Sequence, residues 1–335
     1  MPGGKPPKNK LCFSGAKAKI AFAKAPNGAL GLPHLKQNTM KTENKIKNTK
    51  NKNFFEKCFH GIFLLCGVIS VAFVLFISVY LIIAGVPAIE KIGILKFLFG
   101  PVWNNSNEQY GILAFILTSI YGTAGAVLLG VPIGIFTAVY LAKKAPPKIY
   151  KTVHIAVGVL AGIPSVVYGL IGMIIIVPAI QKAFNLSSGA NLLSAILVLT
   201  VMILPYIINV SVTALKAVPP EYEEASLALG ATKTETFFYV SLKAAKSGVV
   251  TSVMQGVGRA VGEAMAVIMV AGNVANMPGL LKSVRFLTTA IVSEMSYAPY
   301  GSLQRQALFS IGLVLFLFIM LINGFLYCFV RREKE

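Results

Sequence analysis

Arg259 and Glu263 are the residues of this sequence best suited to binding chemistry, because both stand inside an otherwise apolar segment. Each would cost about 2.5 to 3.5 kcal/mol at the centre of a membrane helix, so a compensating partner is needed. Their spacing of four residues places both on one helix face, where they can pair. The guanidinium fork of an arginine also suits the oxygens of an anion such as phosphate.

Two interpretations of this pair follow from the residues. In the functional one, Arg259 contacts an anion that crosses the membrane, and Glu263 holds or releases that anion by competing for the same guanidinium. In the structural one, the two residues form a salt bridge that joins helices. Buried ion pairs serve either role, so the spacing alone leaves both open.

The composition places these residues in lipid. The 335 residues are 56% hydrophobic and only 13% charged, and the mean hydropathy is +0.72, whereas a soluble domain carries about a quarter charged residues. Runs of about 20 apolar residues are long enough to cross a bilayer as helices. The sequence predicts six such spans, at residues 61–84, 111–141, 152–178, 191–215, 248–272 and 306–330.

Prolines and small residues indicate how these spans are shaped and packed. Pro132, Pro164, Pro178 and Pro205 predict kinked or interrupted helices, which are common in transporters. Small residues that recur every four positions predict close helix packing. They form one ridge, Gly122, Ala126, Gly130 and Gly134, and two shorter pairs, Gly158/Gly162 and Gly258/Gly262.

Much of the net charge of +19 lies in one polar segment, residues 1–57, with thirteen lysines against two glutamates. We interpret this segment as a disordered cytoplasmic tail and not as a nucleic-acid binder, because it lacks an interleaved aromatic pattern. The stretch that begins at Met40 is typical of the natural N-terminus of a protein that continues into a first membrane helix. Residues 1–39 are therefore interpreted as an upstream extension of the reading frame. Residues 58–335 form the predicted membrane domain.

Basic residues predict the orientation. They gather before the first span, in the loop at residues 143–151, in the loop at residues 216–247 and after the last span. The positive-inside rule therefore puts both termini in the cytoplasm. Neither the four cysteines nor the three histidines have the spacing of a disulfide framework or a metal site.

The predicted cytoplasmic loop at 216–247 contains two short helices. Pro219-Pro220 and the acidic residues that follow them open the first helix, and Gly230 ends it. Thr232 and Glu235 have capping-box spacing and open the second helix. The two helices form a compact knob suited to a partner protein. The chain has no GxxxxGK[ST] motif, so a separate subunit must bind any ATP that drives it.

Several motifs resemble those of a known family. Glu224-Ala225 followed by Gly230-Ala231-Thr232 resembles the coupling loop of ABC-importer permeases, although Lys243 stands where that family usually has proline. The segments 258–267, 161–170 and 298–309 are similar to those of the phosphate-specific permeases, and of the PstC type more than the PstA type. The resemblance covers residues 58–330.

The resemblance implies an all-α bundle of six transmembrane helices, of the type I, MetI-like kind, in a bacterial inner membrane. It implies a second permease subunit, a dimer of ATP-binding subunits that hold ATP and Mg²⁺, and an external phosphate-binding protein. The chain itself would carry no cofactor and perform no chemistry. Its implied site residues are Arg259 and Glu263, with Ser165 and Tyr168 as weaker candidates for the path, and Glu224, Ala225, Gly230 and Ala231 for coupling to the ATPase.

Three alternatives stay open at this point. The structural alternative for Ser165 and Tyr168 is hydrogen bonding between helices. The chain could also be the permease of a sulfate or molybdate importer. A stand-alone secondary transporter or channel is the alternative from another class.

Overall fold

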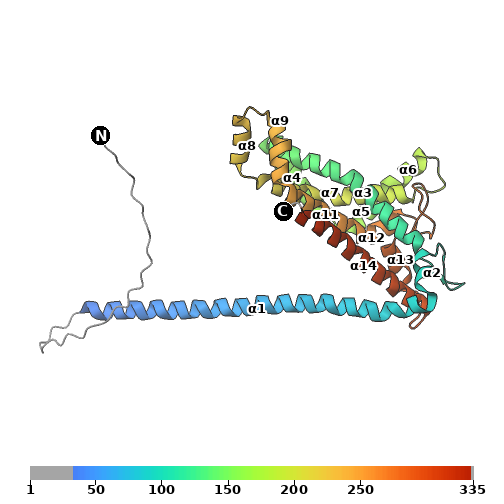
Figure 1. Cartoon of the computed structure of the whole chain (residues 1–335), viewed down its shortest axis with the longest axis horizontal. Helices are drawn as coiled ribbons and strands as arrows, with labels where there is room; N and C mark the ends of the chain where they lie inside the picture. Colours follow the sequence, from blue (N-terminus) through green and yellow to red (C-terminus); the bar gives the residue numbers. More distant parts are fainter. Residues whose placement is uncertain (1–32, 333–335) are drawn as a thin grey trace. The chain divides into compact units, whose positions relative to one another are not determined.

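The computed structural model describes residues 33–332, mostly as helix (Figure 1). The first helix, α1, runs from Pro33 to Ile92. Residues 33–57, which the sequence places in a disordered tail, therefore have a helical backbone, since no proline or glycine interrupts the chain from 34 to 60. Residues 1–32 lie outside the described residues. For them, the disordered tail and most of the upstream extension at residues 1–39 remain predictions.

The chain divides into two compact units, residues 1–70 and 71–335, and the boundary falls within α1. The second unit holds the candidate site. Its elements near the start are α2 (Ile94–Phe99), a hairpin of β1 (Trp103–Asn104) and β2 (Gln109–Tyr110), and α3 (Leu113–Val139) with a π-helical end, η1 (Tyr140–Lys144).

The middle of the unit continues with α4 (Pro147–Gly162), α5 (Ser165–Ile171), η2 (Gly172–Ile176), α6 (Val177–Ala183) and α7 (Leu192–Lys216). The coupling segment follows as α8 (Pro220–Ala228), α9 (Lys233–Glu235), η3 (Thr236–Ser241) and α10 (Leu242–Ala244). The last elements are α11 (Lys246–Val261), α12 (Met265–Val270), α13 (Leu287–Glu294) and α14 (Leu303–Arg332).

Five helical segments among the described residues are long and apolar enough to cross a membrane: Phe59–Ile92, Leu113–Lys144, Ser165–Ala183, Leu192–Lys216 and Leu303–Phe325. Four of them match predicted spans. The predicted span at 152–178 is interrupted, because the residue before a proline avoids helical backbone, and Ile163 accordingly has a ψ of 128° ahead of Pro164. The predicted span at 248–272 is also broken, into α11 and α12. Pro132 and Pro205 lie inside continuous helices.

The core forms where α3 packs along α7. A Cβ atom added at Gly130 would lie 2.7 Å from Cδ1 of Ile203, and one at Gly134 would lie 2.7 Å from Cγ2 of Ile207. This ridge of small residues therefore serves close packing, as predicted. The shorter pairs differ: an added Cβ at Gly158, Gly162 or Gly258 would meet nothing within 4 Å in the described chain.

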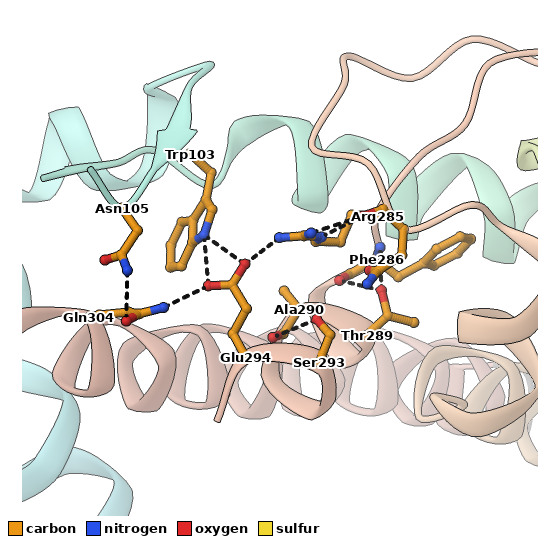
Figure 2. A network of polar contacts seen from close by, with 10 residues as sticks. Trp103, Asn105, Arg285, Phe286, Thr289, Ala290, Ser293, Glu294 and Gln304 are labelled. Atoms are coloured by element: carbon orange, nitrogen blue, oxygen red, sulfur yellow. Dashed lines mark hydrogen bonds and ion pairs between the residues drawn. The ribbon is translucent and has the colours of Figure 1, made fainter. Parts of the chain in front are cut away.

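One end of this unit is organised around Glu294 at the end of α13 (Figure 2). Its carboxylate accepts hydrogen bonds from Trp103 Nε1 at 3.1 Å and from Gln304 Nε2 at 3.1 Å, and it forms an ion pair with Arg285. Asn105 donates in turn to Gln304 at 2.9 Å. This network joins the hairpin, the loop before α13 and the start of α14. Figure 1 shows α8 and α9 at the opposite end from α2 and α13.

Candidate functional site

The charged pair predicted from the sequence lies at a break in the helix. Arg259 belongs to the last turn of α11, which ends at Val261, and Glu263 stands in the gap before α12. Gly262 still donates its N–H to the carbonyl of Gly258 at 3.2 Å, so the backbone completes one turn before it changes direction. The spacing of four residues therefore keeps the two side chains on one face of the chain, close enough to pair.

The two partners of the pair differ in how the protein holds them. Arg259 Nη2 and Glu263 Oε2 are 3.6 Å apart, an ion pair that is longer than a hydrogen bond. Only 4% of the Glu263 side chain is exposed, against 37% for Arg259. The Glu263 carboxylate also accepts the N–H of Ala266 at 3.0 Å, in the first turn of α12, while the Glu263 carbonyl accepts from Thr288 of α13 at 2.7 Å. Glu263 is thus a fixed, buried anion.

Arg259 is incompletely paired. Its buried Nε has no hydrogen-bond partner in the described chain, and its guanidinium carbon lies 5.9 Å from the centre of the Tyr206 ring of α7. A guanidinium carries five N–H donors, and a single ion pair leaves most of them available. The salt bridge between Arg259 and Glu263 is present, as the structural interpretation predicts. The guanidinium also keeps N–H donors that are free to bind an anion, as the functional interpretation requires.

The structure gives Tyr168 a local hydrogen bond. Its side chain is buried, and its hydroxyl donates to the carbonyl of Leu160 at 2.7 Å, across the interruption at Pro164. Tyr168 therefore ties α5 to the end of α4, as the structural alternative for this residue requires. Ser165 is half-buried at the first position of α5.

The coupling segment has the two helices that the sequence predicts, α8 and α9, but the chain after α9 differs from the prediction. Helix α8 ends before Gly230, whose φ is +87°, a value that suits glycine. Thr232 and Glu235 form the predicted capping box. The chain then turns through π-helical η3 and short α10 instead of a regular second helix, and passes directly into α11.

Helix α8 buries none of its residues within this chain. Glu224, Ala225 and Gly230 are exposed and Ala231 is half-buried, so these four predicted coupling residues lie on an open surface. Leu229 is 89% exposed. An exposed apolar side chain on a short helix of this kind is suited to contact with another protein.

Glu223 anchors α8. This anchor could not be predicted from the sequence, because its partners Lys143 and Ser241 are far from Glu223 in the chain. Its carboxylate forms an ion pair with Lys143 of η1 and accepts a hydrogen bond from Ser241 at 2.7 Å. Partial burial acts to raise the pKa of Glu223, but these two bonds and the lysine charge lower it overall from its ordinary value near 4.5. A cavity of about 440 Å³ lies beside this anchor, between the end of α3 and the coupling segment.

The fold resembles that of ABC-importer permeases of known structure. The chain superposes on a solved structure of the MetNI methionine ABC transporter in an inward-facing conformation with a TM-score of 0.52. The match covers 66% of this chain and 95% of that chain at 23% identity. The helices and this likeness define an all-α, multi-pass bundle.

Sequence comparison gives the family. Residues 130–335 match the family described as binding-protein-dependent transport system inner membrane component, and the chain belongs to this family of ABC-importer permeases. It is 36% identical over 307 residues to the probable ABC transporter permease protein YqgH of Bacillus subtilis, a match that covers 89% of this chain and 98% of the relative. It is 32% identical over 292 residues to the phosphate transport system permease protein PstC of Haemophilus influenzae, covering 81% and 92%. The protein is thus a multi-pass permease subunit of the inner membrane.

Proposed function

We propose that this chain is the PstC-type permease subunit of an ATP-driven phosphate importer. The observation that supports this most directly is the half-exposed, incompletely paired guanidinium of Arg259 at the break between α11 and α12. Several relatives that bear the name of a phosphate permease support the choice of anion. In this proposal Arg259 contacts phosphate in the path, and Glu263 competes with phosphate for Arg259.

The partners follow from the same proposal. A PstA-like second permease completes the path, a dimer of PstB-like subunits binds ATP and Mg²⁺, and a PstS-like protein delivers phosphate outside. This chain carries no cofactor and no ATP site of its own. Both termini face the cytoplasm, which puts α8 and its exposed residues Glu224 and Ala225 on the side where the ATPase lies.

The connections within the chain suggest how ATP would drive the path. The coupling segment passes through α10 directly into α11, whose far end carries Arg259. Its α8 is tied to the end of α3 through Glu223 and Lys143. Movement of α8 by the ATPase therefore reaches α11 through the backbone and α3 through this ion pair. Because Glu263 is held by α12 and α13, such movement would change its distance from Arg259.

The two alternative functions predict different experimental results. A sulfate or molybdate permease would move those anions in preference to phosphate, which competition between anions in an uptake assay reveals. A stand-alone secondary transporter would purify without an ATPase, whereas the exposed coupling surface of α8 favours a stable complex.

The test is uptake of labelled phosphate by cells that lack their own high-affinity importer and express the complete set of subunits. We expect Arg259→Ala to abolish uptake and Arg259→Lys to reduce it strongly, because lysine lacks the bidentate fork. Both variants must reach the membrane and assemble. Normal uptake by both variants would leave the pair with a structural role only, and accumulation of sulfate or molybdate by the wild type would overturn the assignment of phosphate.

A further inference from the structure

Helix α11 carries a row of polar side chains on its exposed face. Ser247, Thr251, Gln255 and Arg259 follow one another at intervals of four residues, so they lie on one side of the helix. The first three residues are exposed and Arg259 is half-exposed. The hydroxyl of Thr251 donates to the carbonyl of Ser247 at 2.8 Å. The amide of Gln255 has no partner among the described residues.

The adjacent face of α11, which packs against α7, fixes the depth of this row. Ser252 shares a hydrogen bond of 2.8 Å with Ser211 of α7, and a Cβ added at Gly256 would lie 3.1 Å from Ile207. Arg259 reaches Tyr206. The row therefore runs antiparallel to the second half of α7, which is one of the five segments able to span the membrane. It extends from the coupling segment inward to Arg259.

A polar row at this depth needs a polar surrounding. An amide that loses its hydrogen bonds in hydrocarbon costs several kcal/mol. A surface of this unit suited to lipid has an apolar composition that the exposed face of α11 lacks. The exposed residues of α1 from Val71 onward, for example, include Phe73, Phe76 and Ile83. The exposed face of α11 therefore meets water or polar groups and not acyl chains.

The space beside Arg259 is also open. A Cβ added at Gly258 would meet nothing within 4 Å, and one at Gly262 would meet only its own helix. The glycines thus leave room on the face that carries the polar row. Gln255 lies one turn from Arg259, about 6 Å along the axis, which is within reach for an anion that passes from one residue to the next.

We propose that Thr251 and Gln255 line the water-filled route between Arg259 and the coupling segment, and that Gln255 donates its amide N–H groups to the anion after it leaves Arg259. The inference rests on the proposed function for the nature of the anion. A neutral amide can donate hydrogen bonds to an oxyanion without adding a second positive charge. The anion is therefore passed on and not trapped.

The first test reads water access without any transport. In the assembled complex, the four cysteines of this chain are replaced by serine and a single cysteine is placed at 251, 255 or 252. Membranes are treated with a charged, lipid-insoluble thiol reagent, and labelling is read on this chain alone. Thr251→Cys and Gln255→Cys react, whereas Ser252→Cys, on the face packed against α7, reacts at least tenfold more slowly. An unreactive cysteine at both 251 and 255 in an assembled complex overturns the proposal, since the face is then covered by lipid or by another subunit.

The second test reads contact with the anion. We expect Gln255→Glu to lower phosphate uptake about tenfold or more, because a carboxylate repels an anion one turn from Arg259. Gln255→Asn keeps the amide and retains most of the activity. Equal uptake by the Gln255→Glu variant and the wild type overturns the contact. If the wild type moves another oxyanion, the phosphate assignment falls, and the same comparison is made with that anion.

Discussion

Replacement of Glu263 by glutamine isolates the charge of this residue from its shape. The wild-type carboxylate accepts the N–H of Ala266 through one oxygen and faces Arg259 with the other, at 3.6 Å. Glutamine keeps an acceptor oxygen for Ala266, so the start of α12 remains capped. Only the negative charge that competes for Arg259 is lost.

The expected magnitude follows from the distance. Two unit charges 3.6 Å apart attract each other by about 4 to 5 kcal/mol at an effective dielectric constant of about 20. The Arg259 side chain is 37% exposed, so screening lowers this figure, and an incoming anion must itself be desolvated. We therefore expect Glu263→Gln to bind the anion about 1 to 2 kcal/mol more tightly, or about 5- to 30-fold. Transport should slow, because tighter binding at Arg259 delays release.

The assay measures the affinity of the assembled, purified transporter for labelled phosphate without the external binding protein, together with uptake in cells. Glu294→Gln is the matched control, since it also removes a carboxylate paired with an arginine, but the arginine is Arg285 and not Arg259. We expect this control to leave the affinity unchanged. Unaltered or weaker binding by an assembled Glu263→Gln complex would refute the competition between Glu263 and the anion.

Three further outcomes are expected. Gly130→Leu should destabilise the purified complex by about 1–3 kcal/mol through overpacking against Ile203, seen as a lower Tm, whereas Gly158→Leu, at an open position, should not lower it. Lys143→Glu should uncouple ATP hydrolysis from uptake and Glu223→Lys in the same chain should restore much of it, unless the pair has no part in coupling, in which case the single variant transports normally. The pKa of Glu223 is lower in the folded state than its ordinary value. Its ionised form therefore stabilises the fold above the ordinary carboxyl pKa, and this stabilisation is lost as pH falls through the lower, folded-state pKa. Thermal unfolding between pH 3 and 7 should show this loss in the wild type but not in Glu223→Gln.

Local signals in the sequence were enough to predict local structure. The capping box of Thr232 and Glu235 depends on residues three apart, and the structure contains it. The ridge with Gly130 and Gly134 depends on a period of four, and it meets isoleucines of α7. The pair of Arg259 and Glu263 was likewise visible from its spacing, and the two side chains do lie together.

Features that depend on distant contacts could not be predicted in this way. The apolar run 248–272 gives no sign that the helix stops at Val261, because the carbonyl of Glu263 at the break bonds to Thr288, 25 residues further along the chain. The tie between Lys143 and Glu223 joins residues 80 positions apart. The network around Glu294 in Figure 2 draws on the hairpin, the loop before α13, α13 itself and the start of α14, so no single motif contains it.

The unequal burial of the charged pair is the strongest argument for a role beyond stability. A pair selected for stability alone would be expected to satisfy both partners, because every unmet donor in a buried arginine adds to the cost of placing it there. Glu263 is satisfied by Ala266 as well as by Arg259, yet Arg259 keeps a buried Nε without a partner and an exposed edge. In the proposed function, an oxyanion that reaches this edge accepts hydrogen bonds from the exposed N–H groups of the guanidinium. The helix break separates Glu263 from α11, the helix that carries Arg259 and continues from the coupling segment, and this is the arrangement that the proposed coupling to an ATPase requires.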